Sequence, residues 1–303
     1  MQSTTKFGTA RNNPFSEFKA NCLLLWLLLI YLLCLVGYGL LLTITNISLD
    51  FDDPIREYIV YCLSFTGILL YALGKMRQLQ ISWRSILGSF PKNYRWMPLL
   101  GLVLVLILLS LGITFLSISL LSSIAPTFAE SLLEDINEAD AQQSSVPFLY
   151  SLVEFIAFVI VAPVIEEFIF RGILIHIWAT KWKTSSAIIL SSLIFGLLHF
   201  NPIGASIAGI VWTLLYIRTG SLFIPIVAHA MNNTLAIALA FFEDLIANDS
   251  NSSKLALDVA SDLWRVGLPL TAISAPLIIG FIYQKWSSEN ATLPYFANVV
   301  KVK

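Results

Sequence analysis

The sequence predicts an all-α, polytopic membrane protein of about eight transmembrane helices, on the basis of its composition, its long apolar segments and the charges between them. Hydrophobic residues make up 57% of the 303-residue chain, charged residues make up 12%, and the mean hydropathy is +0.80. Soluble domains carry about twice that share of charged residues. Most side chains are therefore expected to face lipid or other apolar helices.

Eight apolar segments are long enough, or nearly so, to cross a hydrocarbon layer about 30 Å thick, which takes about 20 helical residues. They cover residues 21–46, 57–74, 97–123, 148–178, 184–201, 203–218, 221–246 and 264–284. The first is too long for a secretory signal, and no small-residue cleavage pattern follows it. We expect residues 1–20 to form a leader, 21–285 a single helical membrane domain and 286–303 a tail.

The charges outside these segments sort into two sets. Lysine and arginine accumulate in cytoplasmic loops of membrane proteins. In this chain most of them fall at 6–19, 75–95, 181–183, 218 and 285–303, which are all on one side of the predicted membrane. The loops of the other side are short or acidic, at 50–57, 130–140 and 243–262. The leader, the tail and both termini are therefore expected to be cytoplasmic.

Two other classes of function find no support in the sequence. Nucleic-acid binding would require a basic stripe, which the chain lacks. The three cysteines, Cys22, Cys34 and Cys62, lie in or beside apolar segments without CxxC spacing, so neither a disulfide framework nor a thiolate metal site is indicated. The partner that the composition does predict is the lipid bilayer.

Ionisable residues interrupt the fourth apolar segment, FIAFVIVAPVIEEFIFRGILIHIW. Each such group costs about 2.5–3.5 kcal/mol at the centre of a membrane helix. Glu167 and Arg171 are four residues apart and can pair, whereas Glu166 points about 100° away from Glu167 and has no partner on its own helix. A buried carboxylate of this kind is a candidate for proton transfer or metal ligation. The alternative is a pair of glutamates at a water-exposed helix end. His176 is expected near the cytoplasmic interface, as an interfacial residue rather than a ligand.

Three further polar residues are expected at the same depth. The turn between the fourth and fifth segments falls near 181–184, and Glu166 and His199 each lie about sixteen residues from it, or about 25 Å along their helices. In the seventh segment His229 and Asn233 share one helix face. A lone histidine would indicate packing. A carboxylate, two histidines and an amide on three helices predict a shared polar site.

These residues stand in three short patterns, Glu166-Glu167-Phe-Ile-Phe-Arg171, Phe195-Gly-Leu-Leu-His199 and His229-Ala-Met-Asn-Asn233. In order and topology they resemble the EExxxR, FxxxH and HxxxN motifs of the CAAX-processing and bacteriocin-processing (CPBP, or Abi) family, over about residues 146–240. The resemblance implies an eight-helix intramembrane endopeptidase with a catalytic chamber open to the cytoplasm, related to type II CAAX prenyl endopeptidases. It also implies a hydrophobic or lipidated peptide or protein substrate, and a bacterial-type plasma membrane or an internal membrane.

The resemblance also implies a role for each motif residue. Glu166 and His199 would activate a water molecule, His229 and Asn233 would stabilise the oxyanion, and Glu167 and Arg171 would orient the site. A Zn²⁺ ion on Glu166, His199 and His229 is the alternative, because one carboxylate and two imidazoles leave a position open for water. The chain has no HExxH, GxSxG or GxGD motif of other proteases. Metal-dependent and glutamate-dependent activation both stay open.

Two other functions are compatible with the same residues. A non-catalytic immunity or scaffold protein of this fold would bind without cleaving, and it would tolerate loss of a motif residue. A proton- or ion-coupled transporter would use the acidic and histidine side chains as an ion path. Such a transporter would show two related halves with discontinuous helices, and the sequence contains no such repeat.

Overall fold

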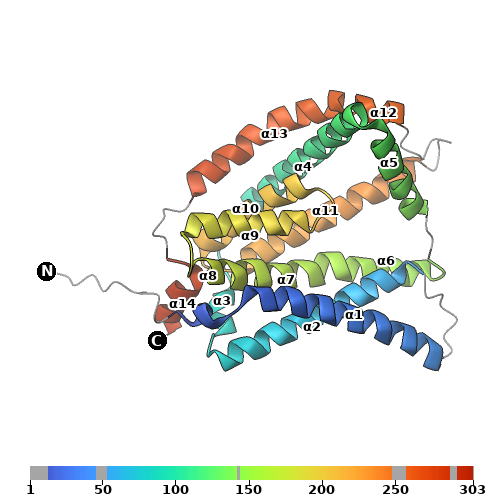
Figure 1. The fold of residues 1–303 in the computed structure, drawn as a ribbon. Helices are drawn as coiled ribbons and strands as arrows, with labels where there is room; N and C mark the ends of the chain where they lie inside the picture. Colours follow the sequence, from blue (N-terminus) through green and yellow to red (C-terminus); the bar gives the residue numbers. More distant parts are fainter. Residues whose placement is uncertain (1–12, 46–52, 142–143, 248–256, 287–291, 303) are drawn as a thin grey trace.

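The computed structural model describes residues 13–45, 53–141, 144–247, 257–286 and 292–302. Within these ranges every regular element is helical and there is no strand. The long helices run roughly along one direction (Figure 1). The predicted all-α architecture is confirmed.

Helices stand at all eight predicted positions. They are α1 (Ala20–Thr45), α2 (Ile55–Gln78), α4 (Trp96–Ile124), the helix from α6 to α8 (Pro147–Trp178), α9 (Thr184–Leu197), α10 (Pro202–Thr219), α11 (Phe223–Ala247) and α13 (Trp264–Lys285). Among the described residues, six helices are long and apolar enough to span a membrane, while α9 and the apolar part of α11 are shorter. The chain is a polytopic membrane protein.

Four shorter helices occupy segments that the sequence left as loops or tail. They are α3 (Trp83–Leu87), α5 (Pro126–Ala141), α12 (Leu257–Asp262) and α14 (Pro294–Val302). The tail helix α14 docks on α3, because the Asn298 amide donates to the carbonyl oxygens of Ser85 at 3.0 Å and Gly220 at 2.9 Å. These bonds satisfy two backbone carbonyls at helix ends.

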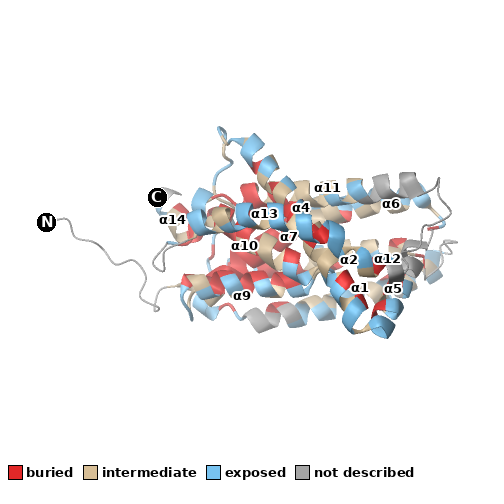
Figure 2. Cartoon of the chain, turned by 90° about the horizontal axis from the view of Figure 1, so that it is seen from above, coloured by how far each residue is buried: buried red, intermediate tan, exposed pale blue. Residues whose placement is uncertain are grey.

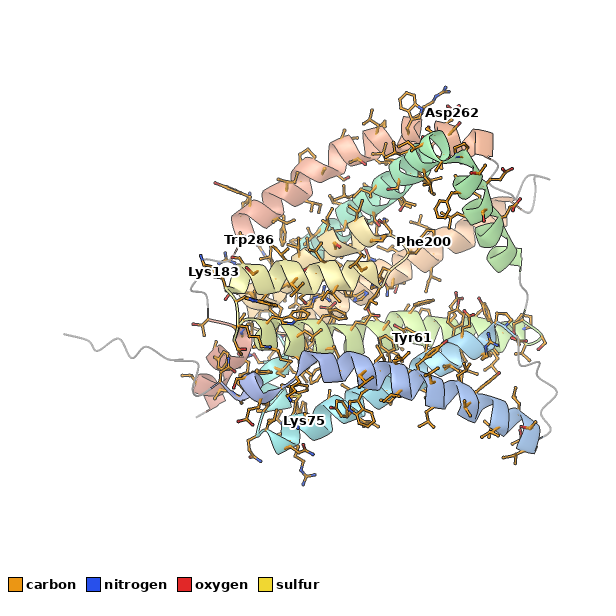
Figure 3. All side chains as sticks on the ribbon, viewed as in Figure 1. Tyr61, Lys75, Lys183, Phe200, Asp262 and Trp286 are labelled. Atoms are coloured by element: carbon orange, nitrogen blue, oxygen red, sulfur yellow. The ribbon has the colours of Figure 1, made fainter. Side chains whose placement is uncertain are left out.

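The start and the end of the described chain meet at one end of the bundle. Phe15 stacks on His176, with ring centroids 4.9 Å apart, and meets Tyr295 of α14 edge-on at 5.0 Å. His176 is therefore fully buried among aromatic rings at this end of the bundle, and its place at the cytoplasmic interface stays a prediction. Lys75 and Lys183 lie toward this same end and Asp262 toward the opposite end (Figure 3), the separation of charge that the loops predicted.

The buried residues concentrate on α7 (Ala162–Glu167), α9 and α10 at the centre of the bundle (Figure 2). In α1, by contrast, large apolar side chains such as Leu33 and Ile44 point outward. Outward apolar side chains suit contact with lipid, because lipid tails are as apolar as the side chains themselves. The second half of the fourth apolar segment, from Ala162 onward, thus forms the interior of the molecule together with the fifth and sixth segments.

The beginning of α2 is tied to the segment before α6 (Pro147–Phe155) by one carboxylate. Asp53 accepts hydrogen bonds from the Ser144 hydroxyl at 2.7 Å, the Ser145 hydroxyl at 2.6 Å and the Ser145 amide at 2.8 Å. It also accepts from the Ile55 amide at the start of α2. Burial raises the pKa of Asp53, but these hydrogen bonds outweigh burial and lower the pKa to about 2.

Replacing Asp53 with Asn should lower the thermal unfolding midpoint in detergent at pH 7. The folded-state pKa lies below the ordinary value of 3.8, so the stabilisation is complete above pH 4 and is lost as the pH falls through about 2. The difference from wild type should therefore shrink in scans carried out toward pH 2. Asp262→Asn is the control, because its ion pair with Arg265 is exposed. If the difference in unfolding midpoint between wild type and Asp53→Asn stayed constant from pH 7 to pH 2, the role of the Asp53 charge would be refuted.

Candidate active site

The two motif glutamates end α7, between two π-helical segments, Ile156–Val161 and Phe168–Leu174. π-Helical turns are rare in proteins overall, and many of those that do occur lie at functional sites. In the first segment the Ala162 amide donates five residues back, to Ala157. The same pattern would pair the Phe158 carbonyl with residue 163, but Pro163 has no N–H. The Phe158 oxygen is instead bonded by the Asn233 amide at 2.8 Å.

Behind the glutamates lies the ion pair that the four-residue spacing predicted. Arg171 Nη1 is 2.8 Å from Glu167 Oε1, and both side chains are fully buried. The guanidinium also donates to the Gly209 carbonyl at 3.1 Å and contacts the Thr213 hydroxyl at 3.4 Å, both on α10. A buried charge pair is tolerated only when such extra hydrogen bonds satisfy its remaining groups.

The same Glu167 oxygen orients His229. The imidazole Nδ1 is 3.0 Å from Glu167 Oε1, and because a carboxylate only accepts, Nδ1 carries the hydrogen. The opposite nitrogen, Nε2, then lies 3.9 Å from Glu166 Oε2. Arg171, Glu167 and His229 thus form one chain of hydrogen bonds, and the free Nε2 of its last member, His229, faces Glu166.

His199 approaches Glu166 from α9 with the same orientation. Its Nδ1 is 2.7 Å from the Phe195 carbonyl, which also only accepts, so Nδ1 again carries the hydrogen. Its Nε2 lies 3.8 Å from Glu166 Oε2. Glu166 and His199 were expected at the same depth along their two helices, and their close approach agrees with that expectation.

One oxygen and two nitrogens therefore face a common gap. Glu166 Oε2 and the ring nitrogens of His199 and His229 lie within 4.8 Å of one another. Oε2 is buried and has no hydrogen-bond partner among the described residues. These separations are too long for direct hydrogen bonds but suit a water molecule or an ion between them. One carboxylate and two imidazoles are also a donor set that Zn²⁺ accepts, so the residues fit this metal.

The other oxygen of Glu166 has a partner that the sequence did not predict. Tyr61 of α2 donates its hydroxyl hydrogen to Glu166 Oε1 at 2.9 Å. Tyr61 lies beside the helix that carries the motif (Figure 3). Its only signal in the sequence is a phenol inside an apolar segment, and such residues are common at helix ends in membranes.

A cavity of about 620 Å³ opens beside these groups. Glu166, His199 and Asn233 line part of it, and most of the remaining wall is apolar, with Leu27 of α1 and Phe65 of α2 among its residues. Five of the six predicted site residues are thus in contact or separated by one gap. Asn233 contributes to the same cavity wall while bonded to the Phe158 carbonyl.

The buried pair should behave as a unit in stability measurements. Arg171→Met should destabilise the protein by about 3–5 kcal/mol, because it leaves the Glu167 charge buried without compensation. Glu167→Gln in the same chain should restore part of that loss, as judged by thermal or denaturant unfolding in detergent. If the loss of unfolding free energy in the double variant equalled the sum of the losses in the two single variants, the pairing would be contradicted.

Comparison with known proteins supports the resemblance of the motifs. Residues 148–235 match the family model described as type II CAAX prenyl endopeptidase Rce1-like. A segment of 83 residues is 35% identical to a Bacillus subtilis (strain 168) protein named "Putative membrane peptidase YdiL", covering 26% of this chain and 34% of that protein. The match thus spans about a third of the relative's length, and no solved structure matches the chain. Residues 148–235 of this membrane protein are therefore similar to type II CAAX prenyl endopeptidases of the Rce1-like kind, in agreement with the resemblance of the three motifs.

Proposed function

We propose that this protein is an intramembrane endopeptidase that hydrolyses a peptide bond near the end of a hydrophobic or lipidated peptide or protein. The observation that carries the proposal is the buried gap between Glu166 Oε2 and the Nε2 atoms of His199 and His229. A water molecule in this gap would lie against the Glu166 carboxylate and the Nε2 atoms of both imidazoles at once. The Rce1-like match of residues 148–235 supports the same reaction class.

Water is a poor nucleophile until a base accepts its proton. In the proposed reaction Glu166 accepts this proton, His199 orients the water through Nε2, and the water oxygen bonds to the carbonyl carbon. The C–N bond then breaks, and the departing amine takes the proton from Glu166. The products are a new carboxylate and a new amine, so hydrolysis consumes one water.

The developing oxyanion needs donors that are already in place. Asn233 uses one amide hydrogen for the Phe158 carbonyl, and its Nδ2 carries a second that is available for the oxyanion. When both of its ring nitrogens carry hydrogen, His229 can donate to the oxyanion through Nε2, and Glu167 fixes the orientation of the ring. Glu167 and Arg171 act by holding His229 in this orientation.

Glu166, His199 and His229 would also hold Zn²⁺, which when bound supplies Lewis-acid activation of water and of the carbonyl oxygen. The orienting role of Glu167 and of the Phe195 carbonyl is the same in both forms, since they fix the two imidazoles. Chelator treatment followed by Zn²⁺ addition separates the two forms, because only the metal-dependent form would lose and regain activity.

The substrate class follows from the cavity wall. A largely apolar cavity inside the bundle favours a hydrophobic chain or a lipid group over a polar peptide. A CAAX-type prenylated end and a bacteriocin-type peptide both have this character. The basic end of the bundle would face the cytoplasm, with both termini there.

Cleavage of quenched fluorescent peptides, with and without a farnesyl group, tests the proposal. Purified wild type should cleave at least one hydrophobic or farnesylated peptide, and Glu166→Ala and His199→Ala should each lower kcat/KM by at least about 100-fold, since general-base catalysis contributes that much or more. Glu130→Ala, an exposed carboxylate change on α5, is the control. Cleavage that survived both site substitutions would contradict the assignment, and the absence of any cleavage would favour a scaffold or a transporter.

A further inference from the structure

The first two helices carry none of the family motifs, and they lie outside the residues that match the family. Yet α2 reaches the candidate site through Tyr61, whose hydroxyl donates to Glu166 Oε1 at 2.9 Å. Among the described residues this is the one hydrogen bond to the Glu166 carboxylate, since Oε2 has no partner. The orientation of Glu166 therefore depends on a residue of another helix, 105 positions away.

The position of Tyr61 is itself fixed by two sets of contacts. Its ring stacks on Phe65, one helical turn further along α2, with centroids 4.1 Å apart. At the start of α2, Asp53 binds Ser144 and Ser145 just before α6. The helix that carries Tyr61 and the helix that carries Glu166 are thus joined independently of the hydrogen bond itself.

We propose that Tyr61 is a positioning residue for the hydrolysis proposed above, on which this inference rests. By holding Oε1, the phenol turns Oε2 toward His199 and His229 and leaves it free for the water. Without the hydroxyl, the carboxylate is free to rotate about its last side-chain bond and to exchange its two oxygens. Misplacing a reacting group by about 1 Å can cost about 100-fold in rate.

The main alternative is that Tyr61 only forms part of the cavity wall, since it lines the cavity together with Phe65. Phenylalanine at position 61 keeps the ring and its stacking on Phe65 but removes the hydroxyl. If Tyr61 only forms part of the wall, Tyr61→Phe should keep the wild-type kcat. If Tyr61 positions Glu166, kcat should fall.

The chain offers a matched control on the same helix. Tyr58 lies three residues before Tyr61, and its hydroxyl donates to Glu154 Oε1 at 3.1 Å and lies 3.2 Å from the Tyr150 hydroxyl. Tyr58→Phe therefore removes a phenol–carboxylate hydrogen bond between the same two helices, away from Glu166. Any general loosening of α2 would appear in both variants.

The experiment measures kcat and KM of Tyr61→Phe, Tyr58→Phe and Glu166→Ala on the farnesylated or hydrophobic peptide that wild type cleaves. Tyr61→Phe should lower kcat by about 10- to 100-fold with KM within twofold of wild type. Tyr58→Phe should stay within about threefold in kcat. Adding Tyr61→Phe to Glu166→Gln should cause no further loss, because the oriented carboxylate is already absent.

Three results would overturn the inference. A wild-type kcat in Tyr61→Phe, with Glu166→Ala inactive, would refute the role of Tyr61 and leave the proposed function intact. Equal losses in Tyr61→Phe and Tyr58→Phe would assign the effect to the packing of α2, as would a matching fall in thermal stability. Full activity of Glu166→Ala would refute the proposed function itself, and with it any role of Tyr61 in orienting that side chain.

Discussion

The structure depends on compensating three charged groups that lie within six residues of one apolar helix. Glu166, Glu167 and Arg171 are all buried, in surroundings where an isolated charge costs several kcal/mol. Glu167 and Arg171 neutralise each other, and Arg171 uses its remaining hydrogens on α10. The close approach of α10 at Gly209 and Thr213 follows from this requirement. Glu166 and Glu167 each keep one carboxylate oxygen, Oε2, that no described residue satisfies. The free oxygen of Glu166 is the one that faces His199 and His229.

The same compensation arranges the candidate chemistry. Glu167 binds both Arg171 and His229, so the ion pair also fixes which nitrogen of His229 faces Glu166. The Phe195 carbonyl does the same for His199, from a separate helix. Because these groups are held by backbone carbonyls and by a buried ion pair, little reorganisation is needed before reaction, which is the condition for effective electrostatic catalysis.

Local patterns in the sequence were enough to predict the eight apolar helices, the Glu167–Arg171 pair and the equal depth of Glu166 and His199. These three features depend only on helical periodicity and on the length of one hairpin. Tyr61 was missed because its contact with Glu166 joins two helices that no local pattern relates. The hydrogen bond from Asn233 to the Phe158 carbonyl depends on a π-helical turn followed by Pro163. The burial of His176 depends on Phe15 and Tyr295, which come from opposite ends of the chain. Such long-range packing overrides what periodicity can indicate.

The gap between Glu166, His199 and His229 is proposed to hold the water that attacks the peptide bond. Single-turnover cleavage in H₂¹⁸O, followed by mass spectrometry of the fragments and of the protein, distinguishes this role from covalent catalysis by Glu166. If the gap holds the attacking water, one ¹⁸O atom enters the new carboxylate of the product and none enters the Glu166 side chain. Label in Glu166 would instead show that the carboxylate itself attacks the peptide carbonyl, and this result would refute the proposed role of the water.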